Sequence, residues 1–276
     1  MKDHPTSFYK MTGGGNDFVI FDNRRKVLPE DYGALAKKVC ERKFSVGADG
    51  LLVLEKEDTA DFRMVYYNAD GSRADMCGNG ARCIARFAYL SKIVPLKMKF
   101  ETDSGPIGAE IIEDSVKLNM GMPKDLKLDL NLKLEDGKQF NASFINTGVP
   151  HAVVLVTDIE KTDVPNLGKA IRFHKEFAPA GANANFVFHK DNHTLIIRTY
   201  ERGVEGETLA CGTGATASAV VCGVKNLVSS PVSCMTKGGE IMTIYFQIGE
   251  ASAGISVNDV YLKGPAAVCF QGEVEL

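Results

Sequence analysis

Apolar residues occur along this chain in short runs that are separated by polar turn residues. The runs are rich in β-branched and aromatic side chains, and Gly, Asn, Asp and Pro lie between them. Because strands of a half-buried sheet have this length and composition, the pattern predicts a fold rich in β-structure. The predicted strands are residues 18–21, 50–54, 62–67, 116–120, 152–156, 186–188, 195–200 and 242–246.

A few stretches have the spacing of helices instead. Residues 31–41 are amphipathic and fit a surface helix. Residues 80–91 place alanine and isoleucine on one stripe, with Arg82 and Arg86 off it. Residues 214–224 are small and apolar nearly all round, which predicts a helix buried on every side.

One pattern occurs in both halves of the chain. In the first half a strand ends at Tyr66-Tyr67-Asn68, and after a loop Cys77-Gly78-Asn79-Gly80-Ala81 opens a helix. In the second half a strand ends at Arg198-Thr199-Tyr200, and Cys211-Gly212-Thr213-Gly214-Ala215 opens a helix. A repeat of this kind indicates a duplicated unit. The predicted domains are residues 1–123 and 124–265.

Composition narrows the class of protein. With 276 residues, of which 45% are hydrophobic and 24% charged, the chain resembles an ordinary globular protein. Its 32 Lys and Arg against 35 Asp and Glu leave a net charge of −3, so nothing favours nucleic acid or an anionic membrane as a partner. The lysine- and leucine-rich stretch 124–138 is expected at the surface.

Signals of location favour the cytoplasm. The first ten residues include Lys2, Asp3, His4 and Pro5 and therefore lack the apolar core of a signal peptide. No apolar run approaches the ~20 residues that a membrane span needs. Seven cysteines at irregular spacing fit free thiols in a reducing compartment better than a disulfide framework.

Each repeat places a cysteine, Cys77 or Cys211, at the start of a predicted helix. The unpaired N–H groups and helix dipole there stabilise a thiolate by up to ~2 kcal/mol, enough to lower a thiol pKa from ~8.5 to about 7. Such a thiol is present in both protonation states at neutral pH, as an acid–base catalyst requires. The flanking glycines let the backbone approach a ligand closely.

Two such helix starts, converging on one cleft, would place a thiol on each face of an α-carbon. Their N–H donors can hold an α-carboxylate and stabilise the charge that develops when the α-proton leaves. One thiolate would remove the proton and the opposite thiol would deliver one, with no metal, flavin or pyridoxal group. The pattern therefore predicts a cofactor-independent amino-acid epimerase. The other cysteines are expected to be buried and structural: Cys40, Cys83, Cys222, Cys234 and Cys269.

At these residues the chain resembles the diaminopimelate epimerase family, over essentially its full length. The order of the matching segments makes the resemblance specific, although any one of them alone is weak. The segments are GGNDF (14–18), GADG (47–50), NADGS (68–72), CGNGARC (77–83), GVPHA (148–152), NANF (183–186), ERG (201–203) and ETLACGTG (207–214).

The resemblance implies an α/β fold of the α+β type. Two pseudo-symmetric domains each wrap a mixed β-sheet around a central helix, and the active site lies in the cleft between them. The C-terminal strand, residues 266–276, is expected to return to the first domain. The implied reaction interconverts LL- and meso-2,6-diaminopimelate on the route to lysine and peptidoglycan, and a homodimer is the expected assembly.

The resemblance also assigns roles to residues of the site. Cys77 and Cys211 match the two bases. Backbone at both helix starts would hold the reacting α-carboxylate, at Gly78, Asn79, Gly212 and Thr213.

Further positions match residues that read the substrate, namely Asn16, Asn68, Asn183 and Arg202. Arg202 suits the distal carboxylate because its guanidinium is a planar fork. Glu201 would meet the reacting ammonium, and His151 would lie beside the thiols. Each has a structural alternative: the asparagines could serve turns, His151 could be a strand-edge histidine, and Glu201 with Arg202 could form a surface pair.

The sequence departs from the family pattern at two places. Val149 stands where some members have a substrate-contacting asparagine, so the distal contacts are expected to be one fewer. The loop 203–207 is one residue longer than the commonest form.

Other functions remain as alternatives. A proline or hydroxyproline racemase typically has His after the first Cys-Gly and Pro before the second cysteine, where this chain has Asn79 and Ala210. An isomerase of the phenazine-pathway type shares the fold but lacks the cysteine pair. A metal or redox module could use Cys77 and Cys83, and a nucleotide-binding module could use the glycine-rich loops 13–15 and 78–80, but neither has the usual spacing.

Overall fold

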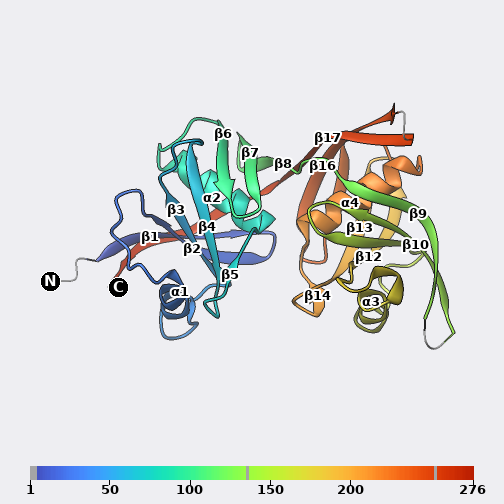
Figure 1. Cartoon of the computed structure of the whole chain (residues 1–276), viewed down its shortest axis with the longest axis horizontal. Helices are drawn as coiled ribbons and strands as arrows, with labels where there is room; N and C mark the ends of the chain where they lie inside the picture. Colours follow the sequence, from blue (N-terminus) through green and yellow to red (C-terminus); the bar gives the residue numbers. More distant parts are fainter. Residues whose placement is uncertain (1–4, 135–136, 252–253) are drawn as a thin grey trace. The chain divides into compact units, whose positions relative to one another are not determined.

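The computed structural model describes residues 5–134, 137–251 and 254–276. These divide into two compact units, one made of Met1–Leu118 with Gly264–Leu276 and the other of Asn119–Lys263 (Figure 1). The predictions that concern residues 1–4 and residues 135–136 of the surface stretch lie outside the described residues.

The first unit is a mixed sheet with a helix on each face. Its strands are β1 (Thr6–Gly13), β2 (Asn16–Asp22), β3 (Gly50–Glu55), β4 (Phe62–Asn68), β5 (Arg73–Ala74), β6 (Lys97–Thr102), β7 (Gly105–Ile112), β8 (Ser115–Asn119) and β18 (Ala267–Val274). Its helices are α1 (Tyr32–Cys40) and α2 (Gly78–Leu90).

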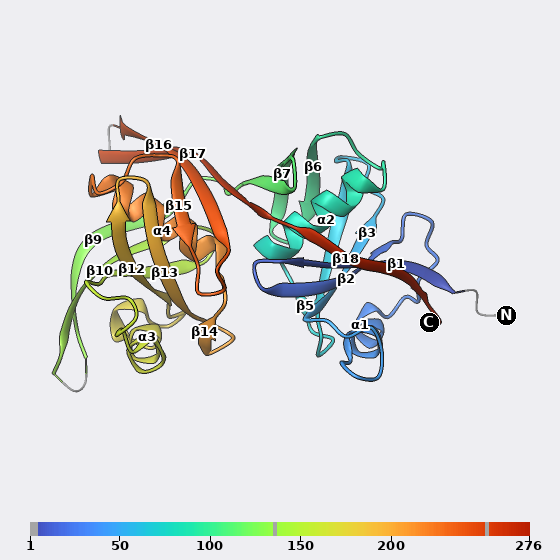
Figure 2. The same cartoon turned by 180° about the vertical axis from the view of Figure 1, so that it is seen from behind.

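The strands of this unit follow the spatial order β18-β1-β2-β3-β4-β6-β7-β8, with β5 beside the end of β4. The pairs β2–β3 and β4–β6 are parallel, and the other pairs are antiparallel. The C-terminal strand β18, in dark red, runs beside β1, in blue (Figure 2).

The central strand β3 shows why helices cover both faces of this sheet. Leu51 and Val53 pack in one cluster with Leu35 of α1, whereas Leu52 lies against Gly80 of α2. Successive side chains of a strand point to opposite faces, so α1 and α2 lie on opposite sides. The sheet also curves around α2, which contacts strands from β1 to β7.

The second unit repeats the same topology strand by strand. Its sheet has the order β9-β10-β11-β12-β13-β15-β16-β17, and the parallel pairs β11–β12 and β13–β15 fall at the corresponding places. Its elements are β9 (Lys124–Lys133), β10 (Gln139–Asn146), β11 (Pro150–Leu155), α3 (Val164–Arg172), η1 (Lys175–Phe177), β12 (Asn183–Asp191), β13 (Thr194–Glu201), β14 (Gly206–Thr208), α4 (Gly212–Val224), β15 (Val232–Met235), β16 (Ile241–Ala251) and β17 (Gly254–Pro265). The duplication inferred from the cysteine segments therefore extends over a whole sheet.

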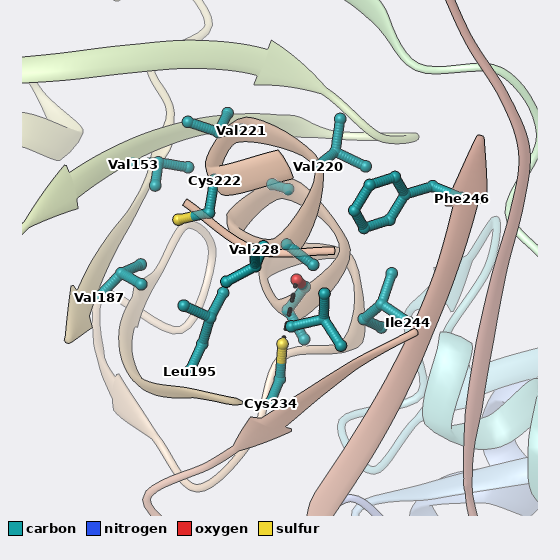
Figure 3. Close-up of a cluster of buried hydrophobic side chains, with 14 of the residues drawn as sticks. Val153, Val187, Leu195, Val220, Val221, Cys222, Val228, Cys234, Ile244 and Phe246 are labelled. Carbon is teal, nitrogen blue, oxygen red and sulfur yellow. Dashed lines mark hydrogen bonds between the residues drawn. The ribbon is translucent and has the colours of Figure 1, made fainter. Parts of the chain in front are cut away.

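The helix α4 lies in the core of its unit. Residues 214–224 are all buried, which confirms the prediction of a helix buried on every side. Figure 3 shows Cys222 on this helix and Cys234 on β15 inside the cluster, where the Cys234 thiol donates to the Ala215 carbonyl at 3.7 Å. Burial raises the pKa of Cys222 to about 12 and also raises that of Cys234, so both are structural thiols, as predicted.

Cys269 differs from the other predicted structural cysteines. It is exposed, because it lies on β18, where residues 267–271 all face solvent. The prediction that it is buried was wrong. Cys40 and Cys83 are buried as expected, and burial raises the pKa of Cys40 to about 12.

The predicted helices were right to within about two residues at either end, but α3 was not predicted. This helix has only nine residues, begins after the Asp163 cap with Pro165 in its first turn, and contains Gly168, so proline and glycine obscure it in the sequence. Tertiary packing explains the glycine, since a Cβ at Gly168 would lie 2.4 Å from the Tyr200 Cβ. None of the described helices is long and apolar enough to cross a membrane.

Candidate active site

Cys77 directly precedes α2 and caps it. Its backbone is extended, its carbonyl accepts from the Ala81 N–H at 2.7 Å, and its Sγ accepts from the Gly80 N–H at 3.4 Å. The half-buried thiol therefore lies among the N–H groups that open the helix, as the sequence predicts.

Cys211 occupies the equivalent place before α4. Its backbone is also extended, its carbonyl accepts from the Ala215 N–H at 2.9 Å, and its Sγ lies 3.4 Å from the Thr213 hydroxyl. The Thr147 hydroxyl donates to the Thr213 carbonyl at 2.9 Å and anchors this first turn to the end of β10. Cys211 is buried, in contrast to Cys77.

In the first unit, Asn79 and Asn16 are hydrogen-bonded to each other. The Asn79 Nδ2 donates to the Asn16 Oδ1 at 2.8 Å and to the Gly14 carbonyl at 3.3 Å. Gly14 has a φ of 65°, and a Cβ there would lie 2.3 Å from the Asn79 Oδ1. The close backbone approach at this glycine thus serves Asn79 rather than a phosphate cradle.

Arg82 orients Asn79 and, through it, Asn16, a role that the sequence did not predict. It lies off the apolar stripe of α2, yet it is completely buried, because the chain at Gly264 and Pro265 covers that side of the helix. Its Nη2 donates to the Asn79 Oδ1 at 2.7 Å and its Nε to the Pro265 carbonyl at 3.3 Å. Its place in the CGNGARC segment was the available signal.

Asp49 binds the side-chain amide nitrogen of Asn16. Its Oδ2 accepts from the Asn16 Nδ2 at 3.0 Å, while its Oδ1 accepts from Arg42 at 2.9 Å. Arg42 also pairs with Asp17, whose second oxygen lies 2.7 Å from the Lys10 Nζ. Burial acts to raise the pKa of Asp17, but its hydrogen bonds and the charges of Arg42 and Lys10 outweigh it and lower the pKa to about 2.

Asn68, at the end of β4, is engaged within its own turn. Its Oδ1 accepts from the Tyr66 hydroxyl at 2.7 Å, and its Nδ2 donates to the Ser72 hydroxyl at 3.0 Å. These bonds fit the turn alternative and also hold the amide in one orientation.

In the second unit, His151 is completely buried on β11 and is not a strand-edge residue. Its Nδ1 lies 3.0 Å from the Asn185 Nδ2. Burial, with the positive charge of Arg202, lowers the pKa of His151 to about 3, so the imidazole is neutral at physiological pH.

Asn183 and Arg202 lie together. The Asn183 Oδ1 accepts from the Arg202 backbone N–H at 2.7 Å, and its Nδ2 donates to the Pro150 carbonyl at 3.1 Å. The Arg202 Nη1 donates to the Ala180 carbonyl at 3.3 Å. Burial raises the pKa of the neighbouring Glu201.

The predicted loop 203–207 forms a tight turn after β13 and then the first residues of β14. Gly203 and Glu205 have positive φ, and the Glu205 N–H donates to the Glu201 carbonyl at 2.8 Å. At the other departure from the family pattern, the Val149 carbonyl accepts from the Thr147 N–H at 3.2 Å.

Comparison with known proteins identifies the family of this chain. A sequence model of the family described as diaminopimelate epimerase matches residues 8–126 and 143–266. The chain belongs to the diaminopimelate epimerase family. The resemblance seen in the sequence and the enzyme class that it implied, an epimerase, are thereby confirmed.

Members of the family match this chain over nearly its whole length. The diaminopimelate epimerase of Aquifex aeolicus is 45% identical, with 97% of each chain covered. That of a Hydrogenobaculum species is 42% identical, covering 95% of this chain and 96% of the relative.

Solved structures with the same fold belong to proteins with other functions. A phenazine biosynthesis protein of the PhzF family from Bacillus anthracis has a TM-score of 0.74 at 16% identity, covering 99% of this chain and 100% of that one. A hydroxyproline epimerase from Agrobacterium vitis has a TM-score of 0.70 at 16% identity, with 100% and 93% covered. At these identities the likeness confirms the predicted epimerase-like α+β fold and says nothing of substrate.

The metal-module alternative finds no support in the side chains of this family member. Among the described residues, no three His, Cys, Asp or Glu side chains gather as a candidate metal site. Cys83 is completely buried in α2, whereas Cys77 is half-buried at its start.

Proposed function

We propose that this chain interconverts LL- and meso-2,6-diaminopimelate with Cys77 and Cys211 as opposing bases and without a cofactor. The observation that carries the proposal is the equivalent placement of the two cysteines, each of which is the N-cap residue of the central helix in one copy of a duplicated topology. Membership of the diaminopimelate epimerase family supplies the substrate.

The reaction needs one proton acceptor and one donor. One thiolate removes the α-proton, which breaks the C–H bond and forms S–H, and the electron pair passes to the α-carbon and its carboxylate. The opposite thiol then gives its proton to the other face and becomes the thiolate. The N–H groups at the helix starts, at Gly78, Asn79, Gly212 and Thr213, hold the α-carboxylate and stabilise the negative charge.

The remaining candidates orient the substrate. Arg202 grips the distal carboxylate with its planar fork, and Glu201 meets the reacting ammonium. The asparagines that bind the polar ends of the substrate are Asn16, Asn68 and Asn183. Their amides have defined hydrogen-bond partners within the protein, which supports pre-organised rather than induced recognition.

The proposal also covers the domains of the protein, its cellular location and its assembly. The domains proposed from the sequence are residues 1–123 with 266–276, and residues 124–265, and each supplies one of the two cysteines. All seven cysteines are thiols rather than disulfides, which supports a reducing cytoplasm. The chain acts as a homodimer in the synthesis of lysine and peptidoglycan precursors.

The test is incubation of the purified protein with LL-diaminopimelate, a chelator and no added cofactor, followed by chiral chromatography. The expected result is conversion to the meso form, together with no pyridoxal absorbance. Complete loss of conversion with the chelator, restored by adding metal back, would contradict the cofactor-free reaction. Conversion of proline instead of diaminopimelate would favour the rival racemase.

A further inference from the structure

The His151 imidazole is held by a hydrogen-bonded group of buried side chains. The Asn185 Nδ2 lies 3.0 Å from the His151 Nδ1 and donates to the Ala152 carbonyl at 3.2 Å. The Asn185 Oδ1 accepts from the Thr199 hydroxyl at 3.0 Å. All three side chains, His151, Asn185 and Thr199, are buried.

These partners determine which end of the Asn185 amide faces the ring. A flipped amide would place its oxygen against the Ala152 carbonyl, which also only accepts, and would turn its NH2 toward Thr199. The atom beside the His151 Nδ1 is therefore an NH2 group, which only donates. The Nδ1 must accept, so it carries no proton, and the proton of the neutral ring lies on Nε2.

The ring thus offers a buried N–H donor. Among the described residues, the His151 Nε2 has no hydrogen-bond partner. An unpaired buried donor lowers stability, so its presence in a native protein calls for an explanation, of which a role in binding or catalysis is one. The ring remains neutral at physiological pH, since its pKa is lowered to about 3.

The same group lies against the first turn of α4. A Cβ at Gly214 would be 2.3 Å from the Asn185 Oδ1 and 3.3 Å from the Thr199 Oγ1. Gly214 is a first-turn residue of the helix that Cys211 caps. The orientation of the imidazole is therefore tied to the helix start where the proposed reaction needs an anion to be held.

We infer that Asn185 is a positioning residue that holds His151 as the neutral Nε2–H tautomer, so that His151 donates a hydrogen bond to an anion of the reaction site and does not act as a base. The nature of the anion rests on the proposed function: it is the Cys211 thiolate or the substrate carboxylate. The tautomer itself follows from the hydrogen bonds alone.

The tautomer is tested by nitrogen NMR of protein labelled with 15N-histidine. The chain has five histidines, and His151→Gln identifies the resonances of this ring. The expected pattern is a protonated Nε2 and an unprotonated Nδ1, unchanged from about pH 6 to about pH 8. A proton on Nδ1, or titration of this ring near pH 6.5, would overturn the inference.

Variants separate positioning from packing. Asn185→Asp replaces the donor with an acceptor, so the proton should move to Nδ1 and kcat/KM should fall ~10- to 100-fold. Thr199→Val removes the bond to the Asn185 Oδ1 but leaves the Ala152 carbonyl to orient the amide, so the Nε2–H tautomer should be retained. Ser218→Ala is the matched control, because the buried Ser218 hydroxyl donates to the Gly214 carbonyl at 2.7 Å without contacting this group. It should leave the NMR pattern unchanged and kcat/KM within about twofold.

The same spectra distinguish the two anions. If the donor meets the thiolate, Cys211→Ser shifts the Nε2 resonance of the free enzyme. If it meets the substrate, the resonance moves only when diaminopimelate is added. A wild-type pattern in folded Asn185→Asp would remove the positioning role. An intact tautomer in a protein that does not convert diaminopimelate would instead count against the proposed function.

Discussion

Arg82 is not assigned to substrate binding, but it orients two residues that are, Asn79 and Asn16. A guanidinium is costly to bury unless its N–H groups are hydrogen-bonded, and Arg82 has no exposed surface. Its bond to the Asn79 Oδ1 leaves the Asn79 Nδ2 to donate to Asn16, and Asn16 in turn donates to Asp49. The orientation of both amides is thus set by charged residues at the two ends of this chain of bonds.

Replacing Asp49 with Asn tests this chain of bonds. An amide cannot accept from Asn16 and Arg42 on both ends, so one bond must be lost. If Asn16 reads the substrate, KM for diaminopimelate should rise ~10-fold with kcat less affected. Steady-state kinetics measures the split. Asp103→Asn is the control, since Asp103 also pairs with arginines, Arg63 and Arg73, but contacts neither asparagine; an equal rise in KM there would argue for a general effect.

Asp17 predicts a dependence of stability on pH. Its pKa is lowered to about 2 in the folded protein, below the ordinary value of about 3.9. A lowered carboxyl pKa stabilises the fold above the unfolded pKa, and this contribution disappears as pH falls through the folded one. Urea unfolding should therefore show Asp17→Asn less stable than wild type near neutrality, with the gap closing from about pH 4 to about pH 2. A gap that stays constant over this range would mean that the charge of Asp17 is not the cause.

At the scale of elements, α4 is shaped by what surrounds it. A helix enclosed on every side has room only for small side chains, and α4 consists of Gly, Ala, Ser, Thr, Val and Cys. A Cβ at Gly223 would lie 2.5 Å from the Phe246 ring. Glycine has a low intrinsic preference for helices, but only a residue without a side chain leaves room for Phe246 at this position.

Two glycine variants should separate packing from chemistry. Gly223→Ala gains about 1 kcal/mol of helix preference but must displace Phe246, so we expect a net loss of about 1–3 kcal/mol in the free energy of unfolding. Gly78→Ala, at the start of α2, has nothing within 4 Å of the new methyl group and should change stability little. It should lower kcat/KM, because the methyl group lies beside the N–H groups proposed to bind the carboxylate. Denaturation and kinetics of both variants check this; a loss of stability in Gly78→Ala without a loss of activity would reverse the assignment.

At the scale of the whole molecule, the chain builds one topology twice, and each copy places a thiol at the start of its central helix. The thiols differ in exposure, since Cys211 is buried and Cys77 half-buried. Inversion of a stereocentre needs a donor and an acceptor on opposite faces, and a duplicated domain can supply both from one kind of site.

Turnover in D2O tests the two-base reaction. Each inversion should place solvent deuterium on the product. Substrate released without inversion should regain its own proton, because under the proposal the thiol that took it faces the original side and returns the proton before it exchanges with water. Early in the reaction, mass spectrometry should find deuterated product and unlabelled remaining substrate. A single shared base would instead label both stereoisomers or carry the original proton across to the product.

Alanine variants complete that test. Cys77→Ala and Cys211→Ala should each lower inversion ~10²- to 10⁴-fold, since each removes the catalyst of one face. Cys83→Ala is the control: this thiol is completely buried in α2, and its loss should cost about 1–3 kcal/mol of stability with inversion retained. Normal inversion by either of the first two variants would exclude the paired-thiol reaction.

The features that the sequence predicted correctly depend on neighbours along the chain. A cysteine followed by glycines marks the start of a helix through local backbone preferences, and the small apolar run 214–224 shows its burial by composition alone. The duplication was visible because both copies keep the same local signals. The family resemblance rests on the same short segments.

Tertiary structure alone decided what distant residues do to one another. Arg82 has the spacing of a polar helix position, but the chain near Pro265 covers it. Asn185 belongs to the NANF segment, yet its partners Thr199 and His151 come from adjoining strands and cannot be known from that segment. Asp49 reaches Asn16 only because β2 and β3 pair side by side. The physical reason is that burial and hydrogen bonding depend on contacts made in space, while local preferences record only the order of residues along the chain.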